Sequence, residues 1–242
     1  MSLVLAADTS TATNSVALCR DSEILAETVL AGGRLHSERL IPTIDWLLSE
    51  AHVTLPEIDL LAVSIGPGSF TGLRIGAATW KGLALANGLP LIGVPTLDAL
   101  TRLSAFPPPG YLAAVLDARM KEVFAAVYRY ESGVRQEVIA PCACSPEDLI
   151  ARIGQLPDFA PQSLGLVGDG ATLYRERFQS HWPTVLLAEP TLGIPRASAV
   201  AQEALALHAT GVTTDGGDVN PVYLRKSQAE VNREKKQASS AT

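Results

Sequence analysis

The sequence predicts an α/β protein with two lobes of related topology, each a mixed β-sheet flanked by helices. Hydrophobic residues make up 47% of the 242 residues and charged residues only 18%, which is enough apolar surface for substantial cores. Short apolar runs alternate with helical patterns along the first hundred residues. A strand–turn–strand pattern near the start, LAADTSTATNSVAL, returns as AVLDARMKEVFAAV further along the chain. The repeat predicts two lobes, and the alternation predicts mixed sheets.

The first lobe is expected to open with three strands. Residues 2–7 are apolar and predict a buried strand, and the polar residues 8–13 predict a turn. Residues 14–20 and 23–30 predict a hairpin around Arg20-Asp21-Ser22.

Helices and strands then alternate through the rest of this lobe. Residues 36–51 carry apolar side chains at helical spacing, with Pro42 marking either the start of the regular helix or a kink. A strand at 60–65, a helix at 72–87 and a strand at 91–94 complete the pattern. The order βββαβαβ predicts a mixed sheet with helices packed on it.

The segment FPPPG at 106–110 predicts a connection between lobes. After it we expect a strand hairpin within 111–130, a strand at 164–167, and helices near 146–153, 171–180 and 196–210. The predicted division is an N-terminal lobe with partner-binding helices at 1–105, a C-terminal lobe at 106–225 and a polar tail at 226–242.

Charge and cysteine content exclude several classes of protein. A net charge of −6 and a pI near 5.2 argue against broad nucleic-acid binding by this chain alone. Cys19, Cys142 and Cys144 form neither an even disulfide framework nor a zinc pattern, and indicate ordinary thiols in a reducing compartment. The first residues lack a basic region before their apolar run, and no stretch approaches the ~20 apolar residues of a membrane span. We therefore expect a soluble, cytoplasmic protein.

The segment GPGSFTGLRIG at 66–76 has three interpretations. A phosphate loop needs Lys-Ser or Lys-Thr after its last glycine, but Gly72 is followed by Leu73-Arg74. A nucleophile elbow needs a serine midway between two glycines, and here Phe70 rather than Ser69 is midway between Gly68 and Gly72. Both patterns fail on spacing.

The third interpretation is a capped turn that begins a helix with a glycine face. Ser69 or Thr71 can accept a hydrogen bond from a free backbone N–H at the helix start. Gly72, Gly76 and Trp80 recur every four residues and share one face, where missing side chains let another backbone approach closely. The approaching group can belong to the protein's own sheet or to a partner, and the spacing favours neither.

The same segment carries a resemblance to a known family. Preceded by LLAVSI and followed by WKGLALANGLPLIGVPTLDAL, it resembles the TsaB (YeaZ) family, and LDARMKEVFAAVY, VGDGA and NPVYLR continue the likeness in order. The resemblance implies the actin-like (ASKHA) ATPase fold, with two lobes of RNase H-like topology. It further implies a non-catalytic paralogue of TsaD that forms a heterodimer with TsaD, acts with the ATPase TsaE, and forms a homodimer without TsaD.

The implied complex transfers a threonylcarbamoyl group to the adenosine beside the anticodon of tRNAs that read codons beginning with A. In the family, the first two helices form the dimer surface, with tRNA bound only through the complex. Trp46 lies off the apolar stripe of the first helix, as interface anchors often do. The positions expected to contribute are Leu40, Ile44, Trp46, Leu47, Gly72, Arg74, Gly76 and Trp80. The alternative for the apolar stripe Leu40, Ile44, Leu47 and Leu48 is the protein's own core, to which about half of it must belong.

Two further segments resemble nucleotide-binding loops of the superfamily. Asp8-Thr9-Ser10 resembles its first phosphate hairpin, but residues 8–14 contain no basic side chain, which favours a role in satisfying the turn. Gly168-Asp169-Gly170 resembles its adenosine loop, so Gly168 and Gly170 join the vestigial nucleotide-binding candidates. We expect no intrinsic cofactor, and the resemblance leaves open ATP or ADP at the junction with TsaD.

No catalytic residue and no metal site are expected. The catalytic paralogue carries metal-binding histidines after a Gly-Val strand end, whereas Gly93-Val94 is followed here by Pro95-Thr96-Leu97 and no histidine. Two enzyme hypotheses remain as alternatives. An ATP-dependent phosphotransferase would use the superfamily cleft, and a glycoprotease-like hydrolase would need metal ligands.

Overall fold

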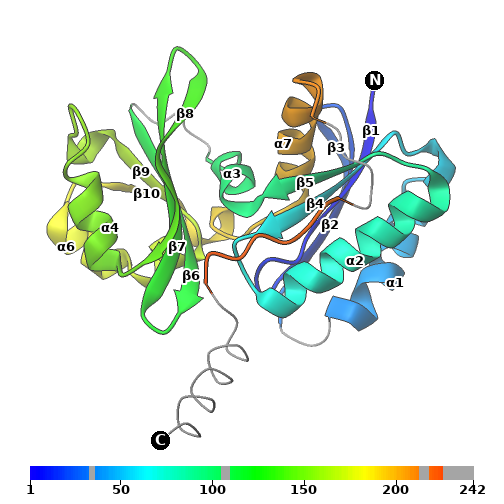
Figure 1. Ribbon diagram of the computed structural model, residues 1–242, viewed down its shortest axis with the longest axis horizontal. Helices are drawn as coiled ribbons and strands as arrows, with labels where there is room; N and C mark the ends of the chain where they lie inside the picture. Colours follow the sequence, from blue (N-terminus) through cyan, green and yellow to red (C-terminus); the bar gives the residue numbers. More distant parts are fainter. Residues whose placement is uncertain (33–35, 105–109, 213–217, 226–242) are drawn as a thin grey trace, which may run out of the picture.

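The computed structural model describes residues 1–32, 36–104, 110–212 and 218–225. Two five-stranded sheets lie side by side, each flanked by helices (Figure 1). The predicted tail 226–242 and the predicted connection 106–110, apart from Gly110, lie outside these residues. Within the described segments, no helix is long and apolar enough to cross a membrane.

The first sheet has the order β3-β2-β1-β4-β5. Its strands are β1 (Leu3–Asp8), β2 (Asn14–Arg20), β3 (Glu23–Leu30), β4 (Leu60–Gly66) and β5 (Leu91–Pro95). The first three pair antiparallel, and β4 and β5 run parallel to β1. All five strands were predicted within two residues of these bounds.

Helices cover both faces of this sheet. Helices α1 (His36–Glu50) and α2 (Phe70–Asn87) lie on one face and α7 (Ala197–Ala209) on the other (Figure 1). Pro42 lies inside α1, so the regular helix begins before it. No sequence pattern indicated the short helix α3 (Thr96–Thr101), and a 3-10 turn spans Leu55–Glu57.

The second sheet repeats the arrangement with the order β10-β9-β6-β7-β8. Its strands are β6 (Tyr111–Arg119), β7 (Glu122–Glu131), β8 (Val134–Cys144), β9 (Leu164–Val167) and β10 (Leu186–Leu187). Strands β6, β7 and β8 pair antiparallel, while β9 and β10 continue parallel to β6. Each sheet thus joins an antiparallel meander to a parallel pair, which confirms the prediction of two lobes of related topology.

Three helices accompany the second sheet. Helix α4 (Pro146–Ile153) matches its predicted range. The helix predicted at 171–180 is wrong as a single element, because α5 (Asp169–Leu173) and α6 (Arg175–His181) are separated at Tyr174, whose φ of −105° and ψ of 21° leave the helical region. Two 3-10 turns, Pro161–Ser163 and Pro190–Leu192, complete this lobe.

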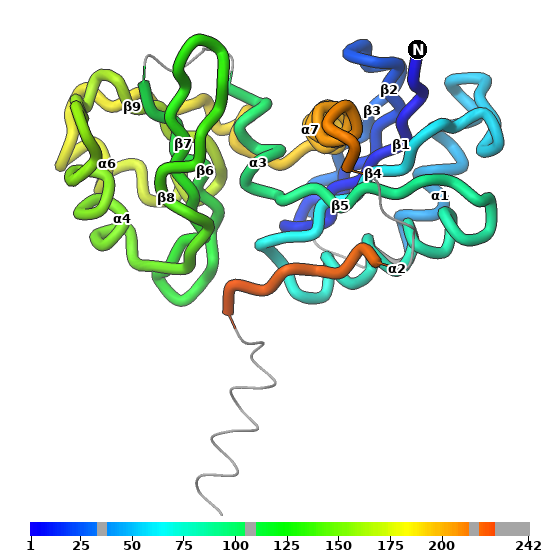
Figure 2. Tube along the Cα trace, turned by 45° about the horizontal axis from the view of Figure 1, so that its top comes forward, coloured from blue at the N-terminus to red at the C-terminus, as the bar shows by residue number. Residues whose placement is uncertain are grey.

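The end of the described chain returns to the first lobe. Helix α7 was predicted within the lobe at 106–225, but its buried residues pack with Val4, Ala62 and Ile92 of the first sheet. Residues 218–225, which we call the strap, then cross in front of α2 (Figure 2). The strap is fixed to β4, because the Val222 N–H donates to the Ile65 carbonyl at 2.7 Å.

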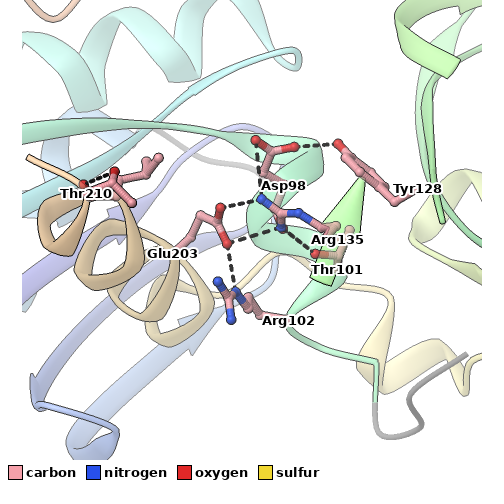
Figure 3. A network of polar contacts seen from close by, with 8 residues as sticks. Asp98, Thr101, Arg102, Tyr128, Arg135, Glu203 and Thr210 are labelled. Atoms are coloured by element: carbon pink, nitrogen blue, oxygen red, sulfur yellow. Dashed lines mark hydrogen bonds and ion pairs between the residues drawn. The ribbon is translucent and has the colours of Figure 1, made fainter. Parts of the chain in front are cut away.

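A buried ionic network joins the lobes (Figure 3). Glu203 of α7 is 2% exposed, and its carboxylate accepts hydrogen bonds from Arg102 at 2.7 Å and from Arg135 of β8 at 2.5 Å. Arg135 also lies 3.7 Å from the carboxylate of Asp98 on α3, which accepts a 2.5 Å hydrogen bond from the Tyr128 hydroxyl. The network therefore connects α3 and α7 to strands β7 and β8.

The fold shifts the pKa values of the two carboxylates in this network in opposite directions. Burial raises the pKa of Asp98, and the hydrogen bond from Tyr128 only partly offsets it. Burial also acts to raise the pKa of Glu203, but the hydrogen bonds and charges of Arg135 and Arg102 outweigh it and leave that pKa below its ordinary value. The two arginines therefore favour the ionised form of Glu203, whose carboxylate accepts hydrogen bonds from both of them.

Candidate functional site

A cleft of about 450 Å³ opens between the two lobes. Segments from both lobes and the strap line it, namely residues 10–13, 67–70, 116–119 and 222–225, with Phe124 and Asp169. The cleft thus brings together the loop after β1, the start of α2, the C-terminal end of β6 and the start of α5. In this position the predicted nucleotide-binding loops face each other.

The Asp8-Thr9-Ser10 hairpin is tied to its own surroundings. Ser10 donates from its N–H and its Oγ to Asp8 Oδ1, at 2.9 and 2.8 Å. Thr9 Oγ1 donates to the Gly72 carbonyl at 2.9 Å, and the Ser69 N–H donates to the Ser10 carbonyl at 2.6 Å. All three side chains are at most 1% exposed, and of the three only Ser10 lines the cleft. These contacts agree with the expected role of the hairpin in satisfying the turn.

The glycine face of α2 meets this hairpin. A Cβ on Gly72 would lie 2.0 Å from the Thr9 carbonyl oxygen, and one on Gly76 would lie 2.3 Å from Thr9 Oγ1. Ser69 is the N-cap, and its side chain accepts a hydrogen bond from the Gly72 N–H at 3.3 Å. The capped turn is confirmed, but the assignment of Gly72 and Gly76 to a partner surface is wrong, because the group that approaches them is the protein's own Thr9, with its backbone at Gly72 and its side chain at Gly76.

Alanine at Gly72 is expected to destabilise the fold although alanine favours helices. Relief of the clash with Thr9 costs about 1–3 kcal/mol, beyond the gain of about 1 kcal/mol in helix propensity. A Cβ on Gly82 of the same helix would meet no neighbouring atom of the described chain within 4 Å, so Gly82→Ala is expected to stabilise by up to about 1 kcal/mol. Urea unfolding of both variants measures this difference, and a stabilising Gly72→Ala would contradict it.

Four other predicted partner residues belong to the core. Leu40, Ile44 and Leu47 are at most 5% exposed and lie on the side of α1 that packs against the core, while Trp80 is fully buried. The Trp80 indole N–H donates to the Leu5 carbonyl at 3.2 Å. Their assignment to the partner surface is wrong, since their spacing marks the face of each helix that is turned to the sheet.

The outward sides of the same helices carry a different set. Trp46 is 54% exposed, as expected of a residue off the apolar stripe, and Ile41 and Leu85 are 52% and 72% exposed. Ala78 and Gly82 lie on the accessible side of α2. We call this set the outer helix face: Ile41, Trp46, Ala78, Gly82 and Leu85.

Arg74 is exposed but engages the strap. Its guanidinium lies 3.8 Å above the Phe70 ring, and its Nε donates to the Tyr223 hydroxyl at 3.1 Å. The Phe70 and Tyr223 rings are themselves 4.4 Å apart. Arg74 therefore fastens the strap to the start of α2, beside the cleft.

On the opposite wall, the glycines of the predicted adenosine loop pack on β6. A Cβ on Gly168 would lie 1.9 Å from the Val115 carbonyl oxygen, and one on Gly170 would lie 2.7 Å from the Leu116 carbonyl carbon. Between them, Asp169 accepts a hydrogen bond from the Asp117 N–H at 2.9 Å. Burial raises the pKa of Asp169. The tight packing explains why glycine stands at both positions.

Both arginines that line the cleft are engaged with carboxylates. Arg119 lies 3.1 Å from Asp117, and Arg225 of the strap lies 2.9 Å from Glu122. Across the described ranges, no group of three or more His, Cys, Asp or Glu side chains is arranged to hold a metal ion. The cleft therefore presents hydroxyls, carboxylates and paired arginines.

Sequence reasoning missed two parts of this site. Phe70 lies in GPGSFTGLRIG and the strap residue Tyr223 lies in NPVYLR, but their contact across the chain has no periodic signal. The interlobe network was also missed, although Glu203 is the only charged residue in the mostly apolar stretch ASAVAQEALAL, which could have indicated a buried ion pair.

Two mixed sheets of the same strand order, with a cleft between them, define an actin-like α/β protein. The ethanolamine utilization protein EutJ from Carboxydothermus hydrogenoformans shares this fold, with a TM-score of 0.51 at 13% identity over 84% of this chain and 89% of that one. YeaZ from Pseudomonas aeruginosa reaches a TM-score of 0.75 at 30% identity, covering 93% of this chain and all of the other.

Sequence relatives narrow the class to one family. The model of the family described as TsaD, tRNA N6-adenosine threonylcarbamoyltransferase, matches residues 23–233. The tRNA threonylcarbamoyladenosine biosynthesis protein TsaB of Escherichia coli (strain K12) is 34% identical, covering 93% of this chain and 96% of that protein. The protein of the same name from Haemophilus influenzae is 33% identical, covering 92% of this chain and 93% of that protein. The chain belongs to the TsaD family, among its TsaB (YeaZ) members, and has a role in the threonylcarbamoyladenosine modification of tRNA.

Proposed function

We propose that this chain is a non-catalytic scaffold and dimerisation subunit of the tRNA threonylcarbamoyltransferase complex. In this proposal it pairs with TsaD, acts with TsaE, and forms a homodimer when TsaD is absent. The complex modifies the adenosine beside the anticodon of tRNAs that read codons beginning with A. The observation that carries the proposal is the outer helix face, where large apolar side chains stand exposed on the two helices that pack on one sheet face.

The chemistry of this face suits helix-to-helix packing. Trp46 offers an aromatic anchor of the kind that dominates interface energies. Ala78 and Gly82 have little or no side chain, and a Cβ on Gly82 would meet no neighbouring atom of the described chain within 4 Å. A partner helix can therefore approach the outer side of α2 closely. A residue that faces the core cannot contact a partner. The proposed surface therefore includes the exposed residues Gly82 and Leu85 of α2 instead of the buried Gly76 and Trp80.

The cleft supports the non-catalytic part of the proposal. The Asp8 carboxylate accepts from Ser10, and the cleft arginines Arg119 and Arg225 are in ion pairs. A nucleotide phosphate would have to displace these contacts. It would also have to approach a chain whose net charge is −6, which repels an anion. We therefore propose no intrinsic cofactor and place any ATP or ADP at the junction with TsaD. We further propose that tRNA is bound only through the complex, in the cytoplasm.

The partner surface is tested by substitutions that leave the core untouched. Trp46→Ala and Gly82→Arg are expected to weaken binding to purified TsaD at least about tenfold in a titration, by loss of the anchor and by a steric block. Leu173→Ala, which removes a 59% exposed apolar side chain from the second lobe, is the matched control and should bind normally. Unchanged affinity and unchanged self-association in both surface variants would contradict the proposal.

The function is tested by reconstituting tRNA modification from purified components with this chain alone left out. The scaffold role predicts loss of modification, and full activity without the chain would overturn it. The two enzyme alternatives have their own signatures. A phosphotransferase would turn over ATP as the isolated chain and lose this activity in Asp8→Ala, and a glycoprotease-like hydrolase would cleave peptides only with added metal.

A further inference from the structure

Two cysteines lie next to each other at the end of β8, in the second lobe and away from the outer helix face. Cys142 and Cys144 are two residues apart on a strand, so their side chains share one face of the sheet. That face packs against the core that includes Leu149 and Ile153 of α4. Their sulfur atoms are 3.9 Å apart, and both side chains are partly exposed.

A cation from α4 is directed at one of the two sulfurs. Arg152 Nη1 lies 3.0 Å from Cys142 Sγ. The hydrogen bond from Cys144, together with the charge of Arg152, outweighs burial and lowers the pKa of the Cys142 thiol to about 6. The same hydrogen bond and burial raise the pKa of Cys144, and the negative charge of the nearby Asp148 raises it further. Near neutral pH the pair is therefore one thiolate beside one thiol.

The third cysteine has the opposite environment. Cys19 on β2 is 1% exposed within the first core. Burial raises the pKa of its thiol to about 12. It thus serves as an internal reference for an unreactive thiol in the same molecule.

We propose that Cys142 and Cys144 form a peroxide-sensitive dithiol, with Cys142 as the attacking sulfur and Cys144 as the resolving one. The Cys142 thiolate attacks hydrogen peroxide, the O–O bond breaks, and Cys142 sulfenic acid forms with release of hydroxide. The Cys144 thiol then attacks the sulfenic sulfur, and a disulfide forms with loss of water. In sum, the dithiol gives two electrons to the peroxide, and two water molecules result once the hydroxide takes up a proton.

The backbone makes this disulfide easy to reduce again. Residues two apart on an extended strand have Cα atoms about 6.6–6.8 Å apart, at the upper limit for a disulfide. A register shift between Ala125 and Val127 of the neighbouring β7 lies beside Cys142 and interrupts the ladder there. A strained, partly exposed disulfide has a high reduction potential, so a thiol reductant restores the dithiol.

The proposal is tested on the full-length chain with hydrogen peroxide and mass spectrometry of tryptic peptides. Both cysteines lie in the peptide that begins after Arg135 and ends at Arg152, so the disulfide appears as that peptide less two hydrogen atoms, and dithiothreitol should reverse it. Before oxidation, iodoacetamide should label Cys142 at least about tenfold faster than Cys19. Equal labelling of the two, or no disulfide at peroxide doses that leave Cys19 reduced, would overturn the proposal.

Variants separate the roles of the three side chains. Cys144→Ser should stop the reaction at a sulfenic acid that dimedone captures at Cys142, and Cys142→Ser should abolish oxidation. Arg152→Ala should slow labelling of Cys142 by about tenfold, and Arg152→Lys should restore part of the rate. Arg20→Ala, an exposed arginine on the first lobe, is the control and should leave the rate unchanged. A normal rate in Arg152→Ala would contradict the role given to this arginine.

Discussion

Replacing Glu203 by alanine is expected to lower the free energy of unfolding by about 3–5 kcal/mol. The substitution removes the carboxylate that pairs with both Arg135 and Arg102 at the lobe junction and leaves the cation of Arg135 partly buried without it. Far-UV circular dichroism during urea unfolding measures the loss. Because the network joins the lobes, the variant is also expected to show separate transitions for the two lobes.

An exposed ion pair gives the matched control. Glu131 is 73% exposed in its side chain and lies 4.0 Å from Arg129, so Glu131→Ala should change stability by less than about 1 kcal/mol. Equal losses in the two variants would contradict the importance of the buried network.

The contribution of Glu203 to the free energy of unfolding depends on pH with a defined sign. The pKa of Glu203 is lowered in the fold, so its contribution is complete above the unfolded value of about 4.3 and is lost as pH falls through the lowered value. The stability difference between the wild type and Glu203→Gln should therefore shrink in acid. Asp98, whose pKa is raised by burial, contributes the opposite slope and favours the fold as it becomes protonated.

Trp80→Ala is expected to cost about 3–5 kcal/mol, because it empties a large, fully buried space beneath α2 and removes the hydrogen bond to the Leu5 carbonyl. Trp46→Ala removes the same side chain from an exposed position and should cost no more than about 0.5 kcal/mol. Thermal or urea unfolding of the two variants distinguishes core from surface. A stable Trp80→Ala or an unfolded Trp46→Ala would reverse the assignment.

Periodic elements were predictable from the sequence, and irregular ones were not. The strands of the first sheet and helix α4 follow apolar patterns that depend only on local spacing. Strand β8 was missed because VRQEVIAPCAC contains a proline and several polar residues, which an edge strand tolerates since one side of its backbone needs no partner. Helix α3 is too short for its periodicity to be recognised.

The candidate site was predictable in position but not in orientation. The spacing of Gly72 and Gly76 correctly predicts the close approach of another segment, yet spacing carries no information on which segment approaches. In the same way, the stripe through Leu40 and Leu47 identifies one face of α1 without saying whether it turns to the sheet or to a partner. Only tertiary packing resolves both questions, and it leaves Trp46 as the predicted anchor that is exposed.

The return of α7 to the first sheet has a consequence for the order of folding during synthesis. The ribosome delivers β1 to β5 early, but the face that α7 covers stays open to water until residues 197–209 have emerged. The second sheet, continuous in sequence from β6 to β10, can close first. A nascent chain stopped near residue 190 should therefore hold a protease-resistant second lobe and an unfinished, protease-sensitive first one.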